Sequence, residues 1–426
     1  MNKLNITSMR DLPLDGKKVL LRLDINSPID IKNKKIVNTN RIDMSLLTLE
    51  YLISKNCKIA IIAHQGDTLD YQNLIPLKEH AGILSKKLNR IVEYVDDVCG
   101  MYAVAKIQCL KEGEIILLGN LRYLSEEIST FETVVPLKPP EMKSTYLVRQ
   151  LVKEFDFYIN DAFAAAHRNA PSMVGFQEHL ISGAGDLFFK EVSALNSVMT
   201  NPQKPSVFVL GGAKISDAFG MMKQVLENNT ADKIITLGII GEIFLIASGV
   251  NIGKKKMKFL QDRKLDEFIE SAKEYLKLYA KKIEIPRDLA FEKDGKREEI
   301  KVCDLPIEEM FLDIGKKTIS DYEKIILEAK SLFANGPAGV YENPLFELGT
   351  RNIMEAISRS SAYSVIGGGD TVTAATKFID LNTLGYVCTA GGAMVRYLTG
   401  KKLPLIEAME KAYYKLNLRE EERDNG

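Results

Sequence analysis

Residues 365–378 read VIGGGDTVTAATKF, and this stretch carries the pattern that decides the fold. A short apolar and β-branched run predicts a buried strand, the glycines predict a tight turn, and the residues after them can form a helix. Glycine lets backbone N–H groups approach a phosphate oxygen closely, and the N-terminus of the following helix attracts negative charge. Asp370, directly after the glycines, is equally well explained as a helix N-cap or as a ligand of Mg²⁺ bound to phosphate.

The same alternation of apolar run and helical spacing recurs along the chain. Buried strands are expected within residues 17–26, 58–64, 114–120, 155–163, 205–212, 233–238, 331–336, 363–369 and 384–392. Helical spacing lies between them, for example in 41–55, 220–229 and 265–282. Continuous strands that alternate with helices predict an α/β fold, with parallel sheets covered by helices on both faces. The chain has 426 residues, so two such domains are expected.

The composition excludes several classes of function. Lys+Arg and Asp+Glu balance at 57 each, which argues against a nucleic-acid or membrane-surface partner. The five cysteines are scattered and show no metal-binding spacing, so we expect reduced thiols, no structural zinc and a cytoplasmic protein. The most apolar stretch, residues 234–250, contains Glu242 and is read as a strand, a turn and a helix rather than as a membrane span.

The expected strand ends of the second half are rich in glycine. They read LGGAK (210–214), ANGPAG (334–339), IGGGDT (366–371) and TAGGAM (389–394). One such turn means little, but several on one sheet favour a site for the phosphates of a nucleotide. Lys214 follows a buried strand and two glycines, and supplies a point charge for a phosphate. Neither a GxxxxGK[ST] nor a GxGxxG motif is present.

The expected strand ends of the first half carry cations instead. Each arginine alone is ordinarily a surface residue, but basic side chains recur after successive strands: Arg22, Arg41, His64, Arg122, His167 and Arg168. Together they predict a basic pocket for a small, multiply anionic ligand. A nucleotide site with Mg²⁺ in one half and a polyanion site in the other, facing each other across a cleft, suggest phosphoryl transfer by an enzyme that closes on its substrates.

These motifs resemble those of the phosphoglycerate kinase family along nearly the whole chain. In the first half they are LRLDINSP (21–28), TNRI (39–42), the HxG of residues 64–66, GNLRYLSEE (119–127) and INDAFAAAHR (159–168). In the second half they are LGGAKISD (210–217), NGPAGVYE (335–342), GGGDT (367–371) and residues 388–409. The HQG variant and FLIASG (244–249) resemble archaeal members.

The resemblance implies two Rossmann-like domains joined by a hinge helix. The phosphoglycerate-binding domain would span 1–180 with residues of about 403–426 packing back onto it, the hinge helix 181–200 and the nucleotide-binding domain 201–402. The helix is expected to end at Asn201–Pro202. The implied reaction is the reversible transfer between 1,3-bisphosphoglycerate and MgADP that gives 3-phosphoglycerate and MgATP, in glycolysis and gluconeogenesis. The protein would be a cytoplasmic monomer with small-molecule substrates only.

Matching positions assign the site residues. Phosphoglycerate would be bound by Asp24, Ile25, Asn26, Arg41, His64, Gly66, Asp67, Arg122 and Arg168. The nucleotide would be bound by Gly211, Gly212, Lys214, Asn335, Pro337, Glu342, Gly367, Gly368, Gly369, Asp370 and Thr371. Glu342 would hold the ribose hydroxyls and Asp370 the magnesium.

A carboxylate nucleophile is already ionised at neutral pH, since such groups titrate near ~4, so no general base is needed. Catalysis then depends on positioning and on charge stabilisation. The catalytic assignments are Arg41 and Lys214 on the transferring phosphoryl group, with the amides of Gly367, Gly368 and Gly369 on the nucleotide side.

Two positions depart from the family pattern. Asp67 stands where a basic residue is usual after HxG, and Ala218 stands where a second lysine is usual. Asp67 either points away from the phosphate, or pairs with a nearby Arg or Lys, or indicates a different substrate. Two alternatives therefore stay open: a kinase that forms an acyl phosphate on another carboxylate, and a nucleotide-binding homologue with weak catalysis.

Overall fold

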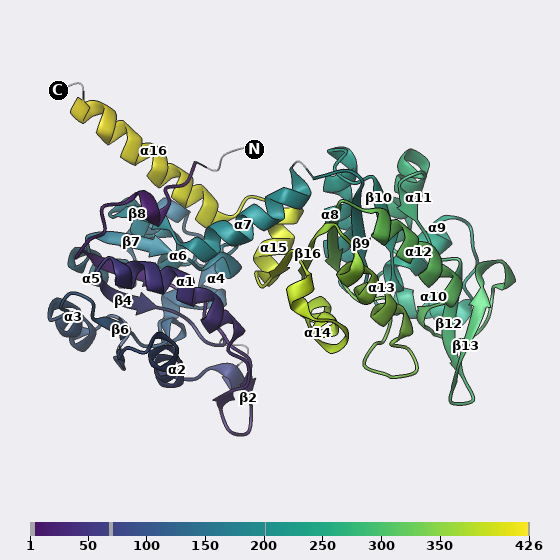
Figure 1. The fold of residues 1–426 in the computed structure, drawn as a ribbon, viewed down its shortest axis with the longest axis horizontal. Coiled ribbons are helices and arrows are strands. Elements are labelled where there is room, and N and C mark those ends of the chain that lie inside the picture. Colours follow the sequence, from purple (N-terminus) through teal and green to yellow (C-terminus); the bar gives the residue numbers. More distant parts are fainter. Residues whose placement is uncertain (1–4, 68–70, 201, 425–426) are drawn as a thin grey trace. The chain divides into compact units, whose positions relative to one another are not determined.

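The computed structural model describes residues 5–67, 71–200 and 202–424. The chain divides into two compact units. The first unit comprises the residues up to Val192 together with those from Lys402 onward, and the second unit comprises Ser193–Lys401. Each unit is built around one parallel sheet (Figure 1).

The sheet of the first unit has six parallel strands. In spatial order they are β5 (Val92–Tyr94), β6 (Ile115–Leu117), β4 (Lys58–Ile62), β1 (Lys18–Arg22), β7 (Phe157–Asn160) and β8 (Ile181–Ala184). The strands that follow β1 in the chain, β4 to β6, lie on one side of it, and β7 and β8 lie on its other side. The strand order therefore reverses between β1 and β7. In open parallel sheets a ligand binds outside the carboxyl ends of the strands at such a reversal.

Helices flank this sheet. They are α1 (Asn40–Ser54), α2 (Lys78–Leu88), α3 (Met101–Gln108), α4 (Ser129–Val134), α5 (Tyr146–Leu151), α6 (Pro171–Val174) and α16 (Pro404–Asp424). A short antiparallel pair, β2 (Ile29–Asp30) with β3 (Lys35–Ile36), lies outside the sheet. The helix α7 (Asp186–Met199) contains the division between the two units.

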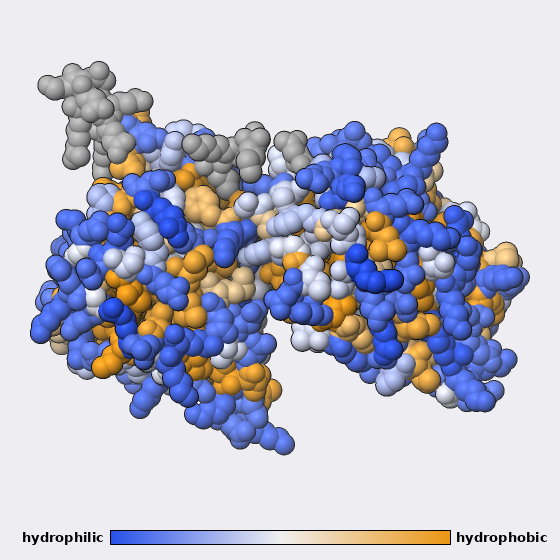
Figure 2. All heavy atoms as spheres, viewed as in Figure 1, coloured by the Kyte–Doolittle hydropathy of each residue, from blue (hydrophilic) through white to orange (hydrophobic). Residues whose placement is uncertain are grey.

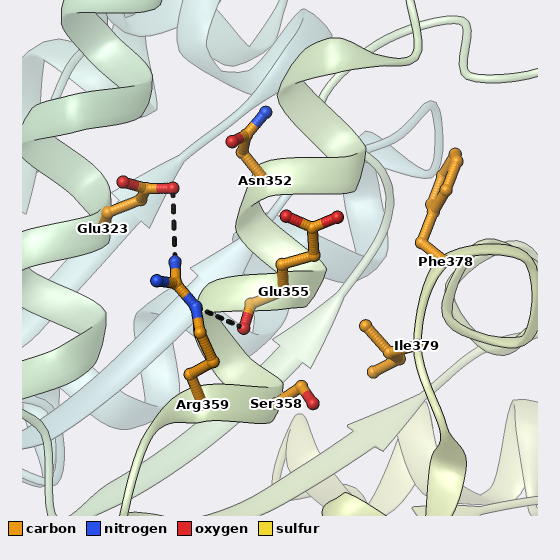
Figure 3. A pocket seen from close by; sticks show the side chains of 7 residues that line it. All are labelled: Glu323, Asn352, Glu355, Ser358, Arg359, Phe378 and Ile379. Carbon is orange, nitrogen blue, oxygen red and sulfur yellow. Dashed lines mark hydrogen bonds and ion pairs between the residues drawn. The ribbon is translucent and has the colours of Figure 1, made fainter.

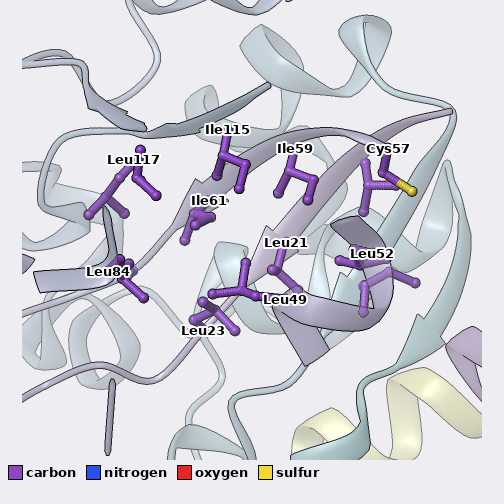
Figure 4. Packing of buried hydrophobic residues seen from close by; sticks show 14 of the residues in the cluster. Leu21, Leu23, Leu49, Leu52, Cys57, Ile59, Ile61, Leu84, Ile115 and Leu117 are labelled. Carbon is purple, nitrogen blue, oxygen red and sulfur yellow. The ribbon is translucent and has the colours of Figure 1, made fainter. Parts of the chain in front are cut away.

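Apolar side chains point to both faces of this sheet, because successive residues of a strand alternate between its faces. On one face Leu21 and Ile61 are fully buried with Leu49 of α1 (Figure 4). On the other face Leu20 and Ile62 are buried in a second cluster. A strand with both faces buried reads as the continuous apolar run seen in the sequence.

The C-terminal helix α16 packs on the first unit. The backbone N–H of Leu405 donates to the carbonyl oxygen of Ala166 over 3.2 Å, and Lys415 pairs with Glu178 at 2.5 Å. The side chain of Asn5 donates to the Tyr414 hydroxyl over 2.6 Å. These contacts tie the end of the chain to the first unit.

The sheet of the second unit also has six parallel strands. In spatial order they are β11 (Ile283–Glu284), β10 (Lys233–Thr236), β9 (Ser206–Leu210), β15 (Ser331–Asn335), β16 (Tyr363–Gly367) and β17 (Tyr386–Cys388). Counted along the chain within this sheet, the order is the doubly wound 3-2-1-4-5-6, whose ligand crevice lies between its first and fourth strands. Those strands are β9 and β15.

The helices of the second unit cover the sheet and its strand connections. They are α8 (Ile215–Glu227), α9 (Gly238–Ala247), α10 (Lys254–Asp262), α11 (Phe268–Tyr279), α12 (Lys316–Glu328), α13 (Leu348–Arg359), α14 (Gly369–Phe378) and α15 (Gly391–Leu398). Ile326 of α12 and Ile353 of α13 share a buried cluster with Val209 and Ile235 of the sheet. Phe219 of α8 stacks on Phe244 of α9 with ring centroids 5.7 Å apart.

The expected α/β fold with two parallel sheets is confirmed, and all nine expected strands form within their stretches. The interpretation of residues 234–250 as strand, turn and helix is also confirmed by β10 and α9. In the part of the chain that the structure describes, no helix combines the length and the apolar character needed to cross a membrane.

Two features differ from the expectations. The single helix over 181–200 is wrong in its first part, because Ile181–Ala184 form the edge strand β8 beside β7 and the helix begins at Asp186. Its expected stop at Asn201 lies outside the described residues.

The second difference is an antiparallel sheet that the sequence analysis did not expect. It consists of β12 (Asp288–Lys293), β13 (Lys296–Lys301) and β14 (Phe311–Ile314). Its outer strand β13 reads KREEIK and has no apolar run to reveal it, and Figure 2 shows mostly hydrophilic residues over the end of the second unit where it lies. The available signal was Asp294-Gly295, whose positive φ angles of 50° and 72° make a two-residue hairpin turn.

Candidate functional site

The basic residues of the first unit converge at the carboxyl ends of its strands. His64 follows β4 and is 7% exposed. Burial holds its pKa well below the usual value, and the charges of Arg22, Arg122, Arg168 and Arg41 lower it further. All four guanidinium groups therefore act on one neutral imidazole, although they come from distant parts of the chain.

Arg22 is held inside the protein beside this imidazole. Its Nη2 lies 3.0 Å from His64 Nδ1, and its Nε donates to Ser172 Oγ over 3.3 Å. The Ser172 hydroxyl donates in turn to Glu127 over 2.7 Å. Burial lowers the pKa of Arg22 and raises that of Glu127, while each charge opposes the shift of the other.

The loop after β1 supplies a carboxylate and an amide. Asp24 forms an ion pair with Arg41, which lies in the first turn of α1. The backbone N–H of Gly66 donates to the Asn26 side chain over 3.1 Å, so the ends of β1 and β4 are joined. The Ile25 side chain is fully buried in the core, so only its backbone is left to face a ligand.

Arg122 and Arg168 come together around Asp67. Asp67 Oδ2 lies 3.7 Å from Arg122 and 3.6 Å from Arg168, and Asp67 Oδ1 accepts a hydrogen bond from Ser129 at 2.8 Å. Burial lowers the pKa of Arg122 to about 10, and the positive charge of Arg168 contributes to this. Of the three explanations left open for Asp67, the structure shows pairing with arginine.

A further carboxylate, Glu132 of α4, was missed by the sequence analysis. Its Oε1 accepts from Arg168 Nε at 2.5 Å, and its Oε2 accepts from the backbone N–H of Asn169 at 3.1 Å. The sequence carried no signal for it, because residues 128–138 read ISTFETVVPLK and Glu132 is their single acidic residue. Glu132, Asp67, Asp24 and Glu127 together offset the positive charge of the arginine cluster.

The glycine-rich strand ends of the second unit also meet. The backbone N–H of Gly211 donates to the Asn335 carbonyl at 2.8 Å, and that of Gly212 donates to the Pro337 carbonyl at 2.9 Å. Gly212 has φ +76°, and a Cβ there would lie 3.2 Å from the Gly336 backbone. Only glycine suits this close approach of the β9 and β15 ends.

The ends of β15 and β16 are joined by side chains. Asn335 Nδ2 donates to the Gly367 carbonyl at 2.7 Å, and the Gly336 N–H donates to Thr371 Oγ1 at 2.7 Å. Gly368 has φ +93°, and an added Cβ would lie 2.6 Å from Asn335 Nδ2. The helix α14 starts at Gly369, so its first N–H groups and the exposed Asp370 lie directly after this junction.

A cavity of about 400 Å³ opens at this edge of the second sheet. Four predicted nucleotide-binding residues line it: Gly212, Pro337, Glu342 and Asp370. Burial raises the pKa of Tyr341, another lining residue, and the charges of Glu342 and Asp370 raise it further. Both carboxylates therefore lie close to the same wall of the cavity.

Lys214 and Ala218 occupy the turn and first part of the helix after β9. Lys214 is exposed at the N-cap of α8, and its ammonium has no ion-pair partner among the described residues. Ala218 is 1% exposed and packs in the interior. The position where a second lysine is usual is therefore part of the core of this chain.

A larger hollow of about 550 Å³ on the second unit contains none of the predicted site residues (Figure 3). On one side of it Arg359 lies 3.6 Å from Glu323 and donates to the Glu355 carbonyl at 3.3 Å, and Phe378 and Ile379 lie on the other side. Arg359 and Glu323 already pair with each other, and the hollow opens widely to the surface.

The fold and the two clusters define a class of protein. It is an α/β protein with two doubly wound sheets, one with arginines and the other with glycines at its strand ends.

Comparison with known proteins narrows this class to a family. The family model described as phosphoglycerate kinase matches residues 9–401. The chain belongs to the phosphoglycerate kinase family.

Named relatives agree with this assignment. The phosphoglycerate kinase of Methanothermus fervidus is 41% identical over 405 residues, covering 95% of this chain and 97% of that protein. That of Sulfurisphaera tokodaii is 40% identical over 411 residues, covering 96% and 97%. The crystal structure of phosphoglycerate kinase from Pyrococcus horikoshii matches with a TM-score of 0.84 at 34% identity, covering 96% of this chain and all of that one. The expected likeness to archaeal members is confirmed.

Proposed function

We propose that this chain catalyses the reversible transfer of a phosphoryl group between 1,3-bisphosphoglycerate and MgADP, giving 3-phosphoglycerate and MgATP. The observation that carries the proposal is the cluster of four arginines around His64, Asp24 and Asp67 in a member of this family. A cluster of guanidinium groups suits a small substrate with a phosphate and a carboxylate.

In the first unit, Arg122, Arg168 and His64 would bind the phosphate of phosphoglycerate, with the backbone of Gly66 and Ile25 beside them. Neutral His64 can donate one hydrogen bond without adding charge. Asp24 and Asn26 would bind the substrate hydroxyl and orient Arg41 toward the carboxylate end. Asp67 would then exchange its pairing with the two arginines for the incoming phosphate.

In the second unit, the cavity at the glycine-rich edge would hold the nucleotide. Glu342 would accept hydrogen bonds from the ribose hydroxyls, and the backbone of Gly211, Gly212 and Pro337 would border the base and sugar. The N–H groups at the start of α14 and the Lys214 ammonium would bind the phosphates. Asn335 and Thr371 would fix this turn, as their hydrogen bonds already do in the structure.

Asp370 would hold magnesium. Mg²⁺ commonly takes one or two carboxylates and completes its shell with phosphate oxygens and water, and the exposed Asp370 beside the cavity suits that pattern. The ion would neutralise charge on the nucleotide phosphates. Among the described residues no group of three or more His, Cys, Asp or Glu could hold a metal by itself, so binding would depend on the nucleotide.

In the ATP-consuming direction, a carboxylate oxygen of 3-phosphoglycerate would attack the γ-phosphorus in line. The new acyl O–P bond forms as the bond to the ADP oxygen breaks, and no proton is transferred. Arg41 and Lys214 would stabilise the charge on the transferring group, and the amides of Gly367, Gly368 and Gly369 would stabilise charge on the nucleotide side. Closing of the two units on both substrates is part of this proposal, and scattering with and without substrates tests it.

A coupled assay with 3-phosphoglycerate and MgATP tests the function. Turnover is expected, and Lys214→Met is expected to lower it by roughly 10²–10³, by analogy with the loss of one transition-state donor. Lys316→Met changes an exposed lysine at the start of α12 and serves as the matched control. No turnover with 3-phosphoglycerate but turnover with another carboxylate would indicate a kinase that forms an acyl phosphate on that carboxylate. Nucleotide binding without any turnover would indicate a homologue with weak catalysis. The known relatives of the chain support neither alternative.

The proposal also places the protein in the cytoplasm as a monomer. Light scattering of the purified chain with and without MgADP measures its mass in solution. A dimer in both states would contradict the proposed monomer.

A further inference from the structure

A buried ion pair lies in the wall of the cavity of the second unit. Glu242 of α9 and Lys256 of α10 both line this cavity. Lys256 Nζ lies 2.7 Å from Glu242 Oε2, and the two side chains are only 3% and 5% exposed. Burying two charges is expensive unless their remaining hydrogen-bonding capacity is also satisfied.

That capacity is largely unused. A carboxylate can accept about four hydrogen bonds and an ammonium can donate three. Among the described residues, Lys256 is the polar partner of the Glu242 side chain, and Glu242 Oε2 accepts no hydrogen bond of good geometry. The ammonium otherwise lies 4.7 Å from the centroid of the Phe259 ring. A polar ligand in the cavity would satisfy the open positions of both groups.

The surrounding chain fixes the pair in place. Gly253, with φ +91°, precedes α10, and the Glu308 carboxylate accepts from the backbone N–H groups of Lys254 and Lys255 at 3.0 Å each. This cap sets the start of the helix at Lys254, two residues before Lys256. The opposing Glu242 lies in the buried part of α9.

Much of the rest of the cavity is lined by apolar side chains, which suit the faces of a nucleotide base. Leu289, Met310 and Phe311 give it apolar walls. The other buried carboxylate, Asp313, already accepts from Arg297 and from the Gly349 N–H at 2.8 Å each, so its Oδ2 serves the protein itself. Its Oδ1 points at Gly339, where an added Cβ would be 2.8 Å away.

We propose that Glu242 and Lys256 determine base specificity by reading the hydrogen-bonding edge of a purine. The carboxylate accepts from an exocyclic amino or ring N–H group, and the ammonium donates to the adjacent ring nitrogen or carbonyl oxygen. Adenine and guanine both present a donor beside an acceptor, whereas unsubstituted purine presents no N–H donor on that edge. The inference rests on the proposed function, since it requires the nucleotide to occupy this cavity.

Calorimetric titration of the whole chain with three magnesium diphosphates tests this inference. The probes are ADP, GDP and the diphosphate of purine riboside. Wild type is expected to bind ADP or GDP roughly 10- to 100-fold more tightly than the purine riboside compound, the value of one hydrogen bond to a charged group. The better of ADP and GDP identifies the base that the pair reads.

The double variant Glu242→Leu with Lys256→Met replaces the pair with apolar groups of similar size. The preference of this variant for ADP or GDP over the purine riboside compound is expected to fall below about threefold. Its affinity for the purine riboside compound is expected to be retained. The matched control is Glu309→Leu with Lys255→Met, which removes an exposed pair 3.5 Å apart and leaves the preference unchanged. If the double variant does not fold, Glu242→Gln keeps the size and is expected to lose at least threefold of the preference.

The outcomes separate this inference from the proposed function. Tight binding of all three diphosphates within threefold of each other, or a double variant that keeps the preference, overturns the inference alone. Failure of wild type to bind any of the three overturns the nucleotide site itself, and the inference with it.

Discussion

Asp67→Asn is expected to strengthen the binding of 3-phosphoglycerate. The wild-type carboxylate lies 3.6 Å from Arg168 and 3.7 Å from Arg122, so a substrate phosphate must replace it at both cations. At these distances each pair is worth roughly 4–5 kcal/mol at an effective dielectric near 20, and about 1 kcal/mol under full solvent screening. The Asp67 side chain is 27% exposed, so the true value lies between these limits.

Asparagine keeps the size of the side chain and can still accept the Ser129 hydrogen bond, so the substitution removes little besides the charge. Part of this gain in affinity is offset because, in wild type, the Asp67 carboxylate that the phosphate displaces is hydrated again. We therefore expect the Kd for 3-phosphoglycerate to fall by about 10-fold, measured by calorimetry at low ionic strength.

The control is Asp15→Asn, which removes the same charge before β1, at the opposite end of the strand from the arginines. Asp15 pairs with Lys55 at 3.3 Å and is 74% exposed. A Kd for Asp67→Asn within twofold of wild type, or an equal fall in the control, would refute the reasoning that Asp67 competes with the substrate phosphate.

Three further predictions concern single residues. Arg41→Ala should lower turnover by roughly 10²–10³ while the calorimetric Kd for MgADP stays within twofold, and an equal loss of ADP binding would contradict its place in the phosphoglycerate site. Asp370→Asn should raise the Mg²⁺ concentration for half-maximal turnover by about 10-fold, and an unchanged metal titration would remove it as a ligand. His80 is buried and its pKa is lowered to about 4, so it stays neutral in the folded protein while the unfolded chain takes up a proton below pH ~6.5. The contribution of neutral His80 to the free energy of unfolding is thus present above that pH and falls by about 2 kcal/mol at pH 5. Urea unfolding should therefore show that His80→Gln loses correspondingly less stability than wild type between neutral pH and pH 5. Equal losses in the two proteins would disprove this prediction.

The strands and the chemistry at their ends could be predicted from the sequence because both signals are local. A strand buried on both faces is a continuous apolar run, as in residues 206–210 of β9, all of which are buried. The residue after a parallel strand lies at the ligand-binding edge of the sheet whatever the rest of the chain does. The strand β13 escaped prediction because its exposed residues are nearly all charged and carry no apolar run.

The partners of the charged residues could not be predicted in the same way. Asp67 had three explanations in the sequence, and its pairing with Arg122 and Arg168 exists because β4, β6 and β7 belong to one sheet. Glu132 showed no pattern of its own, and it meets Arg168 through the packing of a separate helix.

By itself, the sequence determined two parallel α/β sheets, the arginines of one and the glycines of the other, because periodicity and turn chemistry depend on neighbouring residues. The tertiary structure decided which carboxylate faces which cation, at Asp67 and at the buried pair of Glu242 and Lys256. Charge pairing depends on distances between elements that are far apart in the chain, and those distances are set only when the sheets and their helices have packed.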